Sequence, residues 1–166
     1  MPPPMLAATF ERVTVHSMIG NSDERLVGTW KLVSASSATA SGGQSEPPYG
    51  INPVGFLTYS EDGRVTALIS YGGRKPLSIG VKPPALVEEQ AEAFKTFLAY
   101  AGRYSLSGDK IIHSIEISSI QNYVNKELVR SVKFQGDQIV LVTPPTMVNG
   151  KIQTMELVWE RLGVGS

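Results

Sequence analysis

Four side chains in the second half of the chain have the chemical character to form a site: Tyr104, His113, Arg130 and Thr143. An arginine is a permanent cation that stabilises an oxyanion, and a tyrosine or threonine hydroxyl can serve as a second hydrogen-bond donor. A histidine beside a permanent cation in an apolar wall should prefer its neutral form, which accepts a proton. His113, Arg130 and Tyr104 are therefore the candidate catalytic residues.

The spacing of these residues predicts that they form one row across neighbouring strands. Residues opposite each other in a hairpin share a face, and the sum of their numbers is constant. Three turn-like pairs set Tyr104 opposite His113, His113 opposite Arg130, and Arg130 opposite Thr143. Glycine, asparagine and aspartate in such pairs tolerate the positive φ of tight turns. The three pairs are Gly108-Asp109, Gln121-Asn122 and Gly136-Asp137.

Alternation along the same strands places the row on their more apolar face. The same register sets Ile115 opposite Leu128 and Val132 opposite Leu141. Glu116 falls on the other face, so we expect it to point outward and not to act as a general acid.

Arg130 raises a question that the sequence leaves open. A buried guanidinium needs an anion, and the predicted inward faces of its neighbouring strands offer no carboxylate. Either a loop acid such as Glu46 folds in, or the pocket keeps Arg130 hydrated for the oxygen of a ligand. The other two candidate catalytic residues have simpler interpretations. His113 is alternatively a hydrogen-bonded core residue, and Tyr104 is alternatively a hydrogen-bond donor within the barrel wall.

Composition excludes several classes of function. The 166 residues have zero formal net charge, which gives no reason to expect nucleic acid or an anionic membrane as a partner. The absence of cysteine excludes disulfides and thiolate metal sites, and two histidines make a histidine-rich metal site unlikely to form. No membrane-length apolar run, secretory start or nucleotide-binding motif is present, so we expect a cytoplasmic protein without metal or cofactor.

The elements that must position the row are predicted in chain order. Residues 1–23 form a poorly patterned N-terminal arm, and residues 24–166 form one domain. A helix is predicted from Leu86 to Ala101, with apolar residues at helical spacing, either packed on the domain or acting as a lid. The predicted strands run over residues 26–33, 55–60, 64–71, 102–106, 111–117, 128–134, 138–143 and 151–162.

Consecutive antiparallel strands of this kind can bury their apolar face by closing on themselves, which also removes exposed edges. The predicted fold is therefore all-β: a closed eight-stranded antiparallel up-and-down barrel with one inserted helix. Eight strands enclose packed side chains or one small ligand. Trp30 and Arg161 should lie together at the barrel base, with the guanidinium stacked on the indole.

Several stretches carry a resemblance to a known family. The segment Leu26 to Trp30 resembles the Gly-X-Trp of lipocalins, and Trp159 to Arg161 resembles the closing strand of the bacterial and fungal lipocalin-like domain family. The resemblance covers roughly residues 26 to 162. Further stretches that match the family's pattern are Asn52 to Gly55, Tyr59, Asp62-Gly63, Tyr100 to Tyr104, the His113 strand and Val129-Arg130.

Two classes of function follow. In the first, the barrel binds or carries a small, largely apolar molecule with a polar or acidic group. In the second, which the resemblance to fungal members permits, it is a cofactor-free cyclase or isomerase of a polyketide- or terpenoid-like substrate. A structural or interaction role is the third alternative. The protein would be a monomer or homodimer, with no nucleic acid or membrane partner. The predicted ligand-binding residues are Thr143, Tyr59, Trp30, Ile115, Leu128, Phe56 and Trp159.

Overall fold

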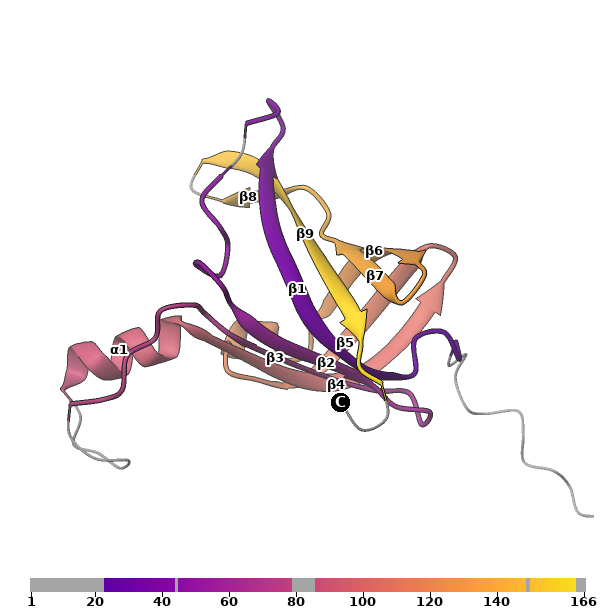
Figure 1. The fold of residues 1–166 in the computed structure, drawn as a ribbon, viewed down its shortest axis with the longest axis horizontal. Coiled ribbons are helices and arrows are strands. Elements are labelled where there is room, and N and C mark those ends of the chain that lie inside the picture. The colour runs from indigo at the N-terminus through magenta and orange to yellow at the C-terminus, as the bar shows by residue number, and fades with distance from the viewer. Residues whose placement is uncertain (1–22, 44, 79–85, 149, 164–166) are drawn as a thin grey trace, which may run out of the picture.

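Nine strands and one α-helix form from the described residues, 23–43, 45–78, 86–148 and 150–163, of the computed structural model (Figure 1). A 3₁₀ turn, η1 (Gln121–Tyr123), joins two of the strands. The α-helix is α1 (Val87–Lys95). The strands are β1 (Gly28–Thr39), β2 (Val54–Tyr59), β3 (Arg64–Ser70), β4 (Phe97–Ser107), β5 (Lys110–Ser118), β6 (Glu127–Gln135), β7 (Gln138–Val142), β8 (Thr146–Val148) and β9 (Lys151–Arg161).

The strands form one antiparallel sheet that closes into a barrel. The pairing order runs from β1 to β7 in sequence, then to β9, and β9 pairs again with β1. Eight strands thus close the barrel, while the three-residue β8 pairs with β9 alone among the described strands. This confirms the predicted all-β, eight-stranded, antiparallel barrel with one helix.

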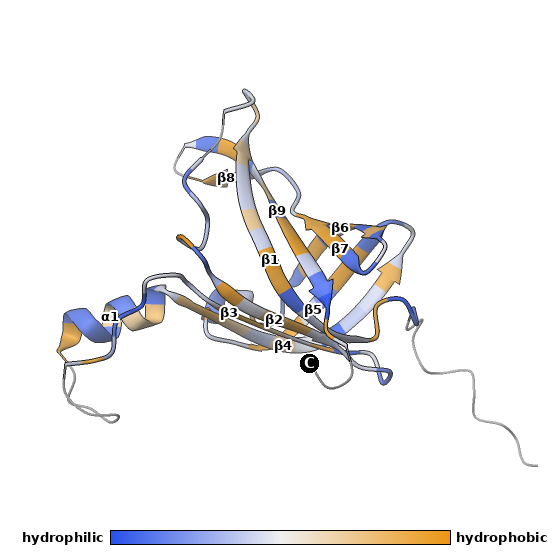
Figure 2. Ribbon diagram, in the orientation of Figure 1, coloured by the Kyte–Doolittle hydropathy of each residue, from blue (hydrophilic) through white to orange (hydrophobic). Residues whose placement is uncertain are grey.

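Tight turns set most of the register as predicted. Gly108 and Gly136 each have φ 61°, a left-handed conformation that suits glycine in a two-residue turn. Tyr104 pairs with His113 and Val132 pairs with Leu141, as the turn positions require. Figure 2 shows hydrophobic and hydrophilic residues alternating along the strands, which is expected where one face of each strand lies inside the barrel.

The connection between β5 and β6 is longer than predicted. The predicted turn at Gln121-Asn122 is part of η1, and Asn125, at φ 61°, completes a wider loop. His113 therefore pairs with Leu128, and Arg130 pairs with Ile111. The predicted pairs of His113 with Arg130, and of Ile115 with Leu128, are wrong by two residues. A shift of two preserves the face, so the side chains keep their predicted direction.

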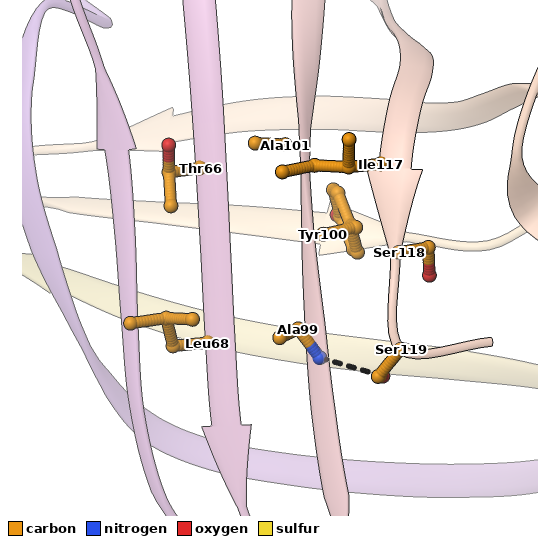
Figure 3. A pocket seen from close by; sticks show the side chains of 8 residues that line it. All are labelled: Thr66, Leu68, Ala99, Tyr100, Ala101, Ile117, Ser118 and Ser119. Carbon is orange, nitrogen blue, oxygen red and sulfur yellow. Dashed lines mark hydrogen bonds between the residues drawn. The ribbon is translucent and has the colours of Figure 1, made fainter.

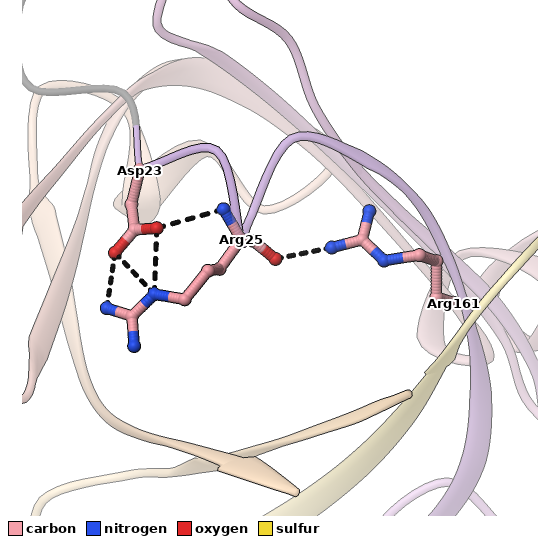
Figure 4. A network of polar contacts seen from close by, with 3 residues as sticks. All are labelled: Asp23, Arg25 and Arg161. Carbon is pink, nitrogen blue, oxygen red and sulfur yellow. Dashed lines mark hydrogen bonds and ion pairs between the residues drawn. The ribbon is translucent and has the colours of Figure 1, made fainter. Parts of the chain in front are cut away.

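One end of the barrel is closed by Arg161, as predicted. Its guanidinium lies 4.2 Å from the centroid of the Trp30 ring, and the Trp30 indole N–H donates to the carbonyl of Leu26 at 2.8 Å. Arg161 also donates to the carbonyls of Val27 and Arg25, the second of which Figure 4 shows beside the Asp23–Arg25 ion pair. This end is therefore held by both stacking and backbone hydrogen bonds.

Gly28 makes room for this arrangement. A Cβ at this position would lie 2.7 Å from Nη1 of Arg161, and Gly28 has φ 133°. A glycine two residues before Trp30 is thus required by a close approach and by backbone conformation together.

The predicted helix from Leu86 to Ala101 is wrong in its second half. Helix α1 ends at Lys95, and Phe97 to Ala101 belong to β4, where they pair with β3. No residue of α1 is buried, and the helix stands out from the barrel beyond the ends of β3 and β4 (Figure 1). The prediction that it packs on the barrel is therefore wrong as well. A lid role stays a prediction.

The predicted N-terminal arm, residues 1–23, lies outside the described residues except for Asp23, so its extent stays a prediction. Within the described ranges, no helix has the length and apolar character needed to cross a membrane.

Candidate functional site

The interior of the barrel contains a cavity with a mixed lining. Its apolar part includes Leu57, Ala67, Leu98, Leu141 and Leu157. Its polar part consists of Tyr49, Tyr100, His113, Tyr123, Arg130 and Thr143. Its empty volume is about 550 Å³, with the open mouth included. The cavity therefore combines apolar walls with a small set of polar groups.

A second hollow lies on the outer wall, over β3, β4 and β5 (Figure 3). Leu68 and Ile117 border it with 40 % and 67 % of their surfaces exposed. Its rim includes Thr66, Ser118 and Ser119 but no charged side chain. Because it is open to solvent and its lining has no charged side chain, we place the candidate site inside the barrel.

His113 lies at the centre of a buried hydrogen-bonded triad. Its Nε2 is 2.8 Å from the hydroxyl of Tyr59, and its Nδ1 is 2.9 Å from the hydroxyl of Tyr100. Burial, with a smaller contribution from the nearby Arg130 cation, lowers the pKa of His113 to about 3. The imidazole is therefore neutral at physiological pH, as expected from the sequence, and one nitrogen donates while the other accepts.

The two tyrosines of the triad differ in their exposure to the cavity. Tyr59 is fully buried, and burial raises the pKa of its hydroxyl well above the ordinary value. Tyr100 lines the cavity, and burial raises the pKa of its hydroxyl to about 12. Both phenols are therefore protonated at physiological pH and available as donors.

Tyr104 is inward-facing but lies outside the set of residues that line the cavity. Its hydroxyl donates to the carbonyl of Ser60 at 3.1 Å, and its ring packs edge-on against the ring of Tyr59, with 4.8 Å between the ring centroids. It pairs with His113 across β4 and β5 as predicted. The Tyr104 hydroxyl thus donates within the wall, as the alternative interpretation expects, and a catalytic role for it stays a prediction.

Arg130 lines the cavity, and it has no carboxylate partner among the described residues. One guanidinium nitrogen donates to the carbonyl of Val129 at 2.8 Å. The loop acid Glu46 is exposed and forms no described contact with it. The predicted ion pair with Glu46 is therefore not found among the described contacts, and a role of Arg130 toward a ligand's oxygen stays a prediction.

The other predicted ligand-binding residues divide into three groups. Thr143, Leu128 and Trp159 line the cavity. Trp30 and Ile115 are buried with 1 % and 2 % of their surfaces exposed, but they do not line it. The last one, Phe56, is wrong as an inward residue: it is 39 % exposed because alternation along β2 turns Leu57 and Tyr59 inward instead.

Sequence reasoning missed part of the lining. Tyr100 and Leu98 were assigned to a helix, so their inward direction in β4 was not seen. Tyr49 and Tyr123 lie in connections between strands, where alternation gives no signal. Met155 lies four residues before Trp159 on the same strand, so alternation places both side chains on one face. This spacing was the available signal that Met155 lines the cavity. Among the described residues, no three histidine, aspartate or glutamate side chains gather closely enough to hold a metal ion.

Comparisons with known proteins agree with this picture. A sequence profile described as a lipocalin-like domain matches residues 27–162. The 4'-hydroxy-3'-methoxypropiophenone carrier protein ppsC of Aspergillus oryzae is 33 % identical over 84 residues, which cover 45 % of this chain and 76 % of that protein.

Two solved structures align more loosely. A lipocalin-like protein from Bacteroides uniformis has a TM-score of 0.42 at 14 % identity, over 83 % of this chain and 99 % of that one. A mutant of the fluorescent protein UnaG has a TM-score of 0.36 at 15 % identity, over 83 % of this chain and 96 % of that one. Alignments this loose support no argument about the site.

Proposed function

Because the chain belongs to the lipocalin-like domain family, we propose that its barrel binds and carries a small, largely apolar, natural-product-type molecule with a polar or acidic group. The similarity to a fungal propiophenone carrier supports this class of ligand. A cavity with apolar walls and a few polar groups is of the kind that holds small molecules.

The observation that carries the proposal is the state of Arg130. Its guanidinium has five N–H donors, and one acceptor, the carbonyl of Val129, is described for them. Arg130 is half-buried and has no anionic partner among the described residues, so a ligand oxygen at this position would stabilise the site. The ligand group that best matches a guanidinium is a carboxylate, a phenolate or a polarised carbonyl.

A second donor supports the same conclusion. The indole N–H of Trp159 is buried, and within the described part of the chain it has no hydrogen-bond partner. Trp159 also lines the cavity. Buried donors without acceptors are uncommon in folded proteins, and each indicates a missing partner. A ligand oxygen or a water molecule that reached this N–H would supply the missing acceptor.

We propose carriage rather than turnover because His113 is poorly placed as a general base. Both of its ring nitrogens are hydrogen-bonded to tyrosines, so accepting a substrate proton would require one of these bonds to break. The low pKa of His113 also makes the imidazole a weak base. Catalysis by a cyclase or isomerase mechanism stays a hypothesis, as do the cytoplasmic location and the monomeric or homodimeric state.

Two measurements test the proposal. Native mass spectrometry of the purified protein should reveal a retained small molecule of the proposed class. Isothermal titration with 4'-hydroxy-3'-methoxypropiophenone as the probe should give binding, which Arg130→Gln weakens by about 10- to 100-fold through loss of a charged hydrogen bond.

Lys133→Gln is the matched control, because Lys133 is an exposed cation on the same strand. It should leave the affinity unchanged. Equal weakening by both variants would attribute binding to general electrostatic attraction and contradict the assigned site. Conversion of the probe into a product would favour the enzyme instead, and a protein that retains no molecule and binds no probe would contradict carriage.

A further inference from the structure

The hydrogen-bonded triad of Tyr59, His113 and Tyr100 has two alternative proton arrangements. A neutral imidazole carries one N–H, on either Nδ1 or Nε2. If Nε2 carries the proton, it donates to Tyr59, and the hydroxyl proton of Tyr59 must find another acceptor. If Nδ1 carries it, Tyr59 donates to Nε2, and Nδ1 donates to Tyr100.

The surroundings of the two tyrosines favour the second arrangement. Tyr59 is fully buried, and the one partner described for its hydroxyl is Nε2 of His113. With the proton on Nε2, the Tyr59 hydroxyl proton would be buried without an acceptor among the described residues, which is costly. Tyr100 lines the cavity, so its proton can reach a ligand or water there. The proton on Nδ1 therefore satisfies every buried group of the triad.

We propose that the triad holds His113 with its proton on Nδ1, so that the Tyr100 hydroxyl accepts from His113 and donates its own proton into the cavity. Tyr100 is then a ligand-contacting donor, and His113 and Tyr59 are positioning residues behind it. Hydrogen bonds in such a chain polarise one another, which strengthens the terminal donor. This inference rests on the proposed function and deepens it by specifying a neutral acceptor, a ketone oxygen, as the group that Tyr100 recognises.

The position of Arg130 allows it and Tyr100 to contact different groups of one ligand. Arg130 lines the same cavity as His113 and Tyr100. A ligand that has both an acidic oxygen and a ketone can use Arg130 for the first and Tyr100 for the second. Selectivity for the ketone should therefore depend on Tyr100, while overall affinity should depend on Arg130.

The first test needs no ligand. Long-range ¹H–¹⁵N correlation spectra of ¹⁵N-histidine-labelled wild-type protein at neutral pH distinguish the two neutral tautomers and the imidazolium. The expected result is a protonated Nδ1 and an unprotonated Nε2 for His113. A protonated Nε2, or an imidazolium, would overturn the inference whether or not the protein is a carrier.

The second test uses two probes that differ in the ketone. These are 4'-hydroxy-3'-methoxypropiophenone and 2-methoxy-4-propylphenol, which keeps the hydroxyl and methoxy groups but has a propyl chain in place of the propanoyl group. Wild-type protein should bind the ketone more tightly by roughly 3- to 10-fold, the contribution of one neutral hydrogen bond. Tyr100→Phe should remove that preference and leave the affinity for the second probe unchanged.

Tyr104→Phe is the control, because it removes a buried hydroxyl from the same strand at a position outside the cavity lining. It should preserve the preference for the ketone. Equal binding of both probes to wild-type protein would overturn the role of Tyr100 while leaving the carrier proposal in place. If neither probe binds, the proposed function fails for this ligand class, its ketone contact falls with it, and the spectra alone decide the tautomer.

Discussion

Acidification should destabilise the folded protein through His113. The pKa of His113 is about 3 in the folded state and about 6.5 when the chain is unfolded. Between these pH values His113 is protonated in the unfolded state but neutral in the folded state. The contribution of His113 to the free energy of unfolding is therefore fully present above about pH 6.5, and it is lost as the pH falls. From about pH 7 to 5 the loss from this residue is about 2 kcal/mol.

Urea unfolding followed by tryptophan fluorescence at about pH 7, 6 and 5 measures this loss. His113→Gln should remove most of the slope of unfolding free energy against pH, although the amide itself alters stability at every pH. His16→Gln is the control, because His16 is the chain's other histidine and lies outside the described residues. A slope that persists in His113→Gln, or that disappears in His16→Gln, would refute the reasoning.

Three further substitutions test the wall and the base of the barrel by their urea midpoints. Gly102→Ala would place a Cβ 2.0 Å from the carbonyl oxygen of Ser114 at a bulge, and it should cost about 1–3 kcal/mol; an unchanged midpoint would show that β4 relaxes there. Arg161→Met keeps an aliphatic stem but loses the stacking on Trp30 and the backbone hydrogen bonds, and it should cost about 1–3 kcal/mol. Glu116→Gln breaks an exposed ion pair and should leave the midpoint unchanged; a clear fall would mean that the pair is more than a surface contact.

Where two strands are joined by a two-residue Gly-Asp turn, the sequence was sufficient to predict which residues pair across the strands. The Gly108 turn predicted the pair of Tyr104 with His113, and the Gly136 turn predicted the pair of Val132 with Leu141. A two-residue turn leaves one register, and alternation then fixes which side chains point inward.

The connection between β5 and β6 shows where this reasoning failed. Asparagine occurs in tight turns, in wider loops and at positive φ alike, so Asn122 and Asn125 offered competing centres. The structure uses η1 and Asn125, which shifts Arg130 by two residues along β5. The inward direction of Arg130 survived because the shift is even.

The misassigned helix has a different physical cause. Residues Phe97 to Ala101 are compatible with either helical or alternating periodicity, and alanine favours the helix. In the folded protein, pairing with β3 and β5 outweighs this local preference. Because Tyr100 lies in a strand and not in a helix, its hydroxyl reaches His113. The contact between Tyr100 and His113 was therefore not predictable from local sequence.

The seam between β1 and β9 has a consequence for how the chain folds. Arg161 and Val27, which meet at this seam, are separated by 134 residues of sequence. The cost of closing so long a loop must be met before the seam's contacts can form, which slows folding. Until β9 docks, the free edges of β1 and β7 can pair with other chains. We therefore expect the nascent protein to be most prone to aggregation in the interval before its last strand is in place.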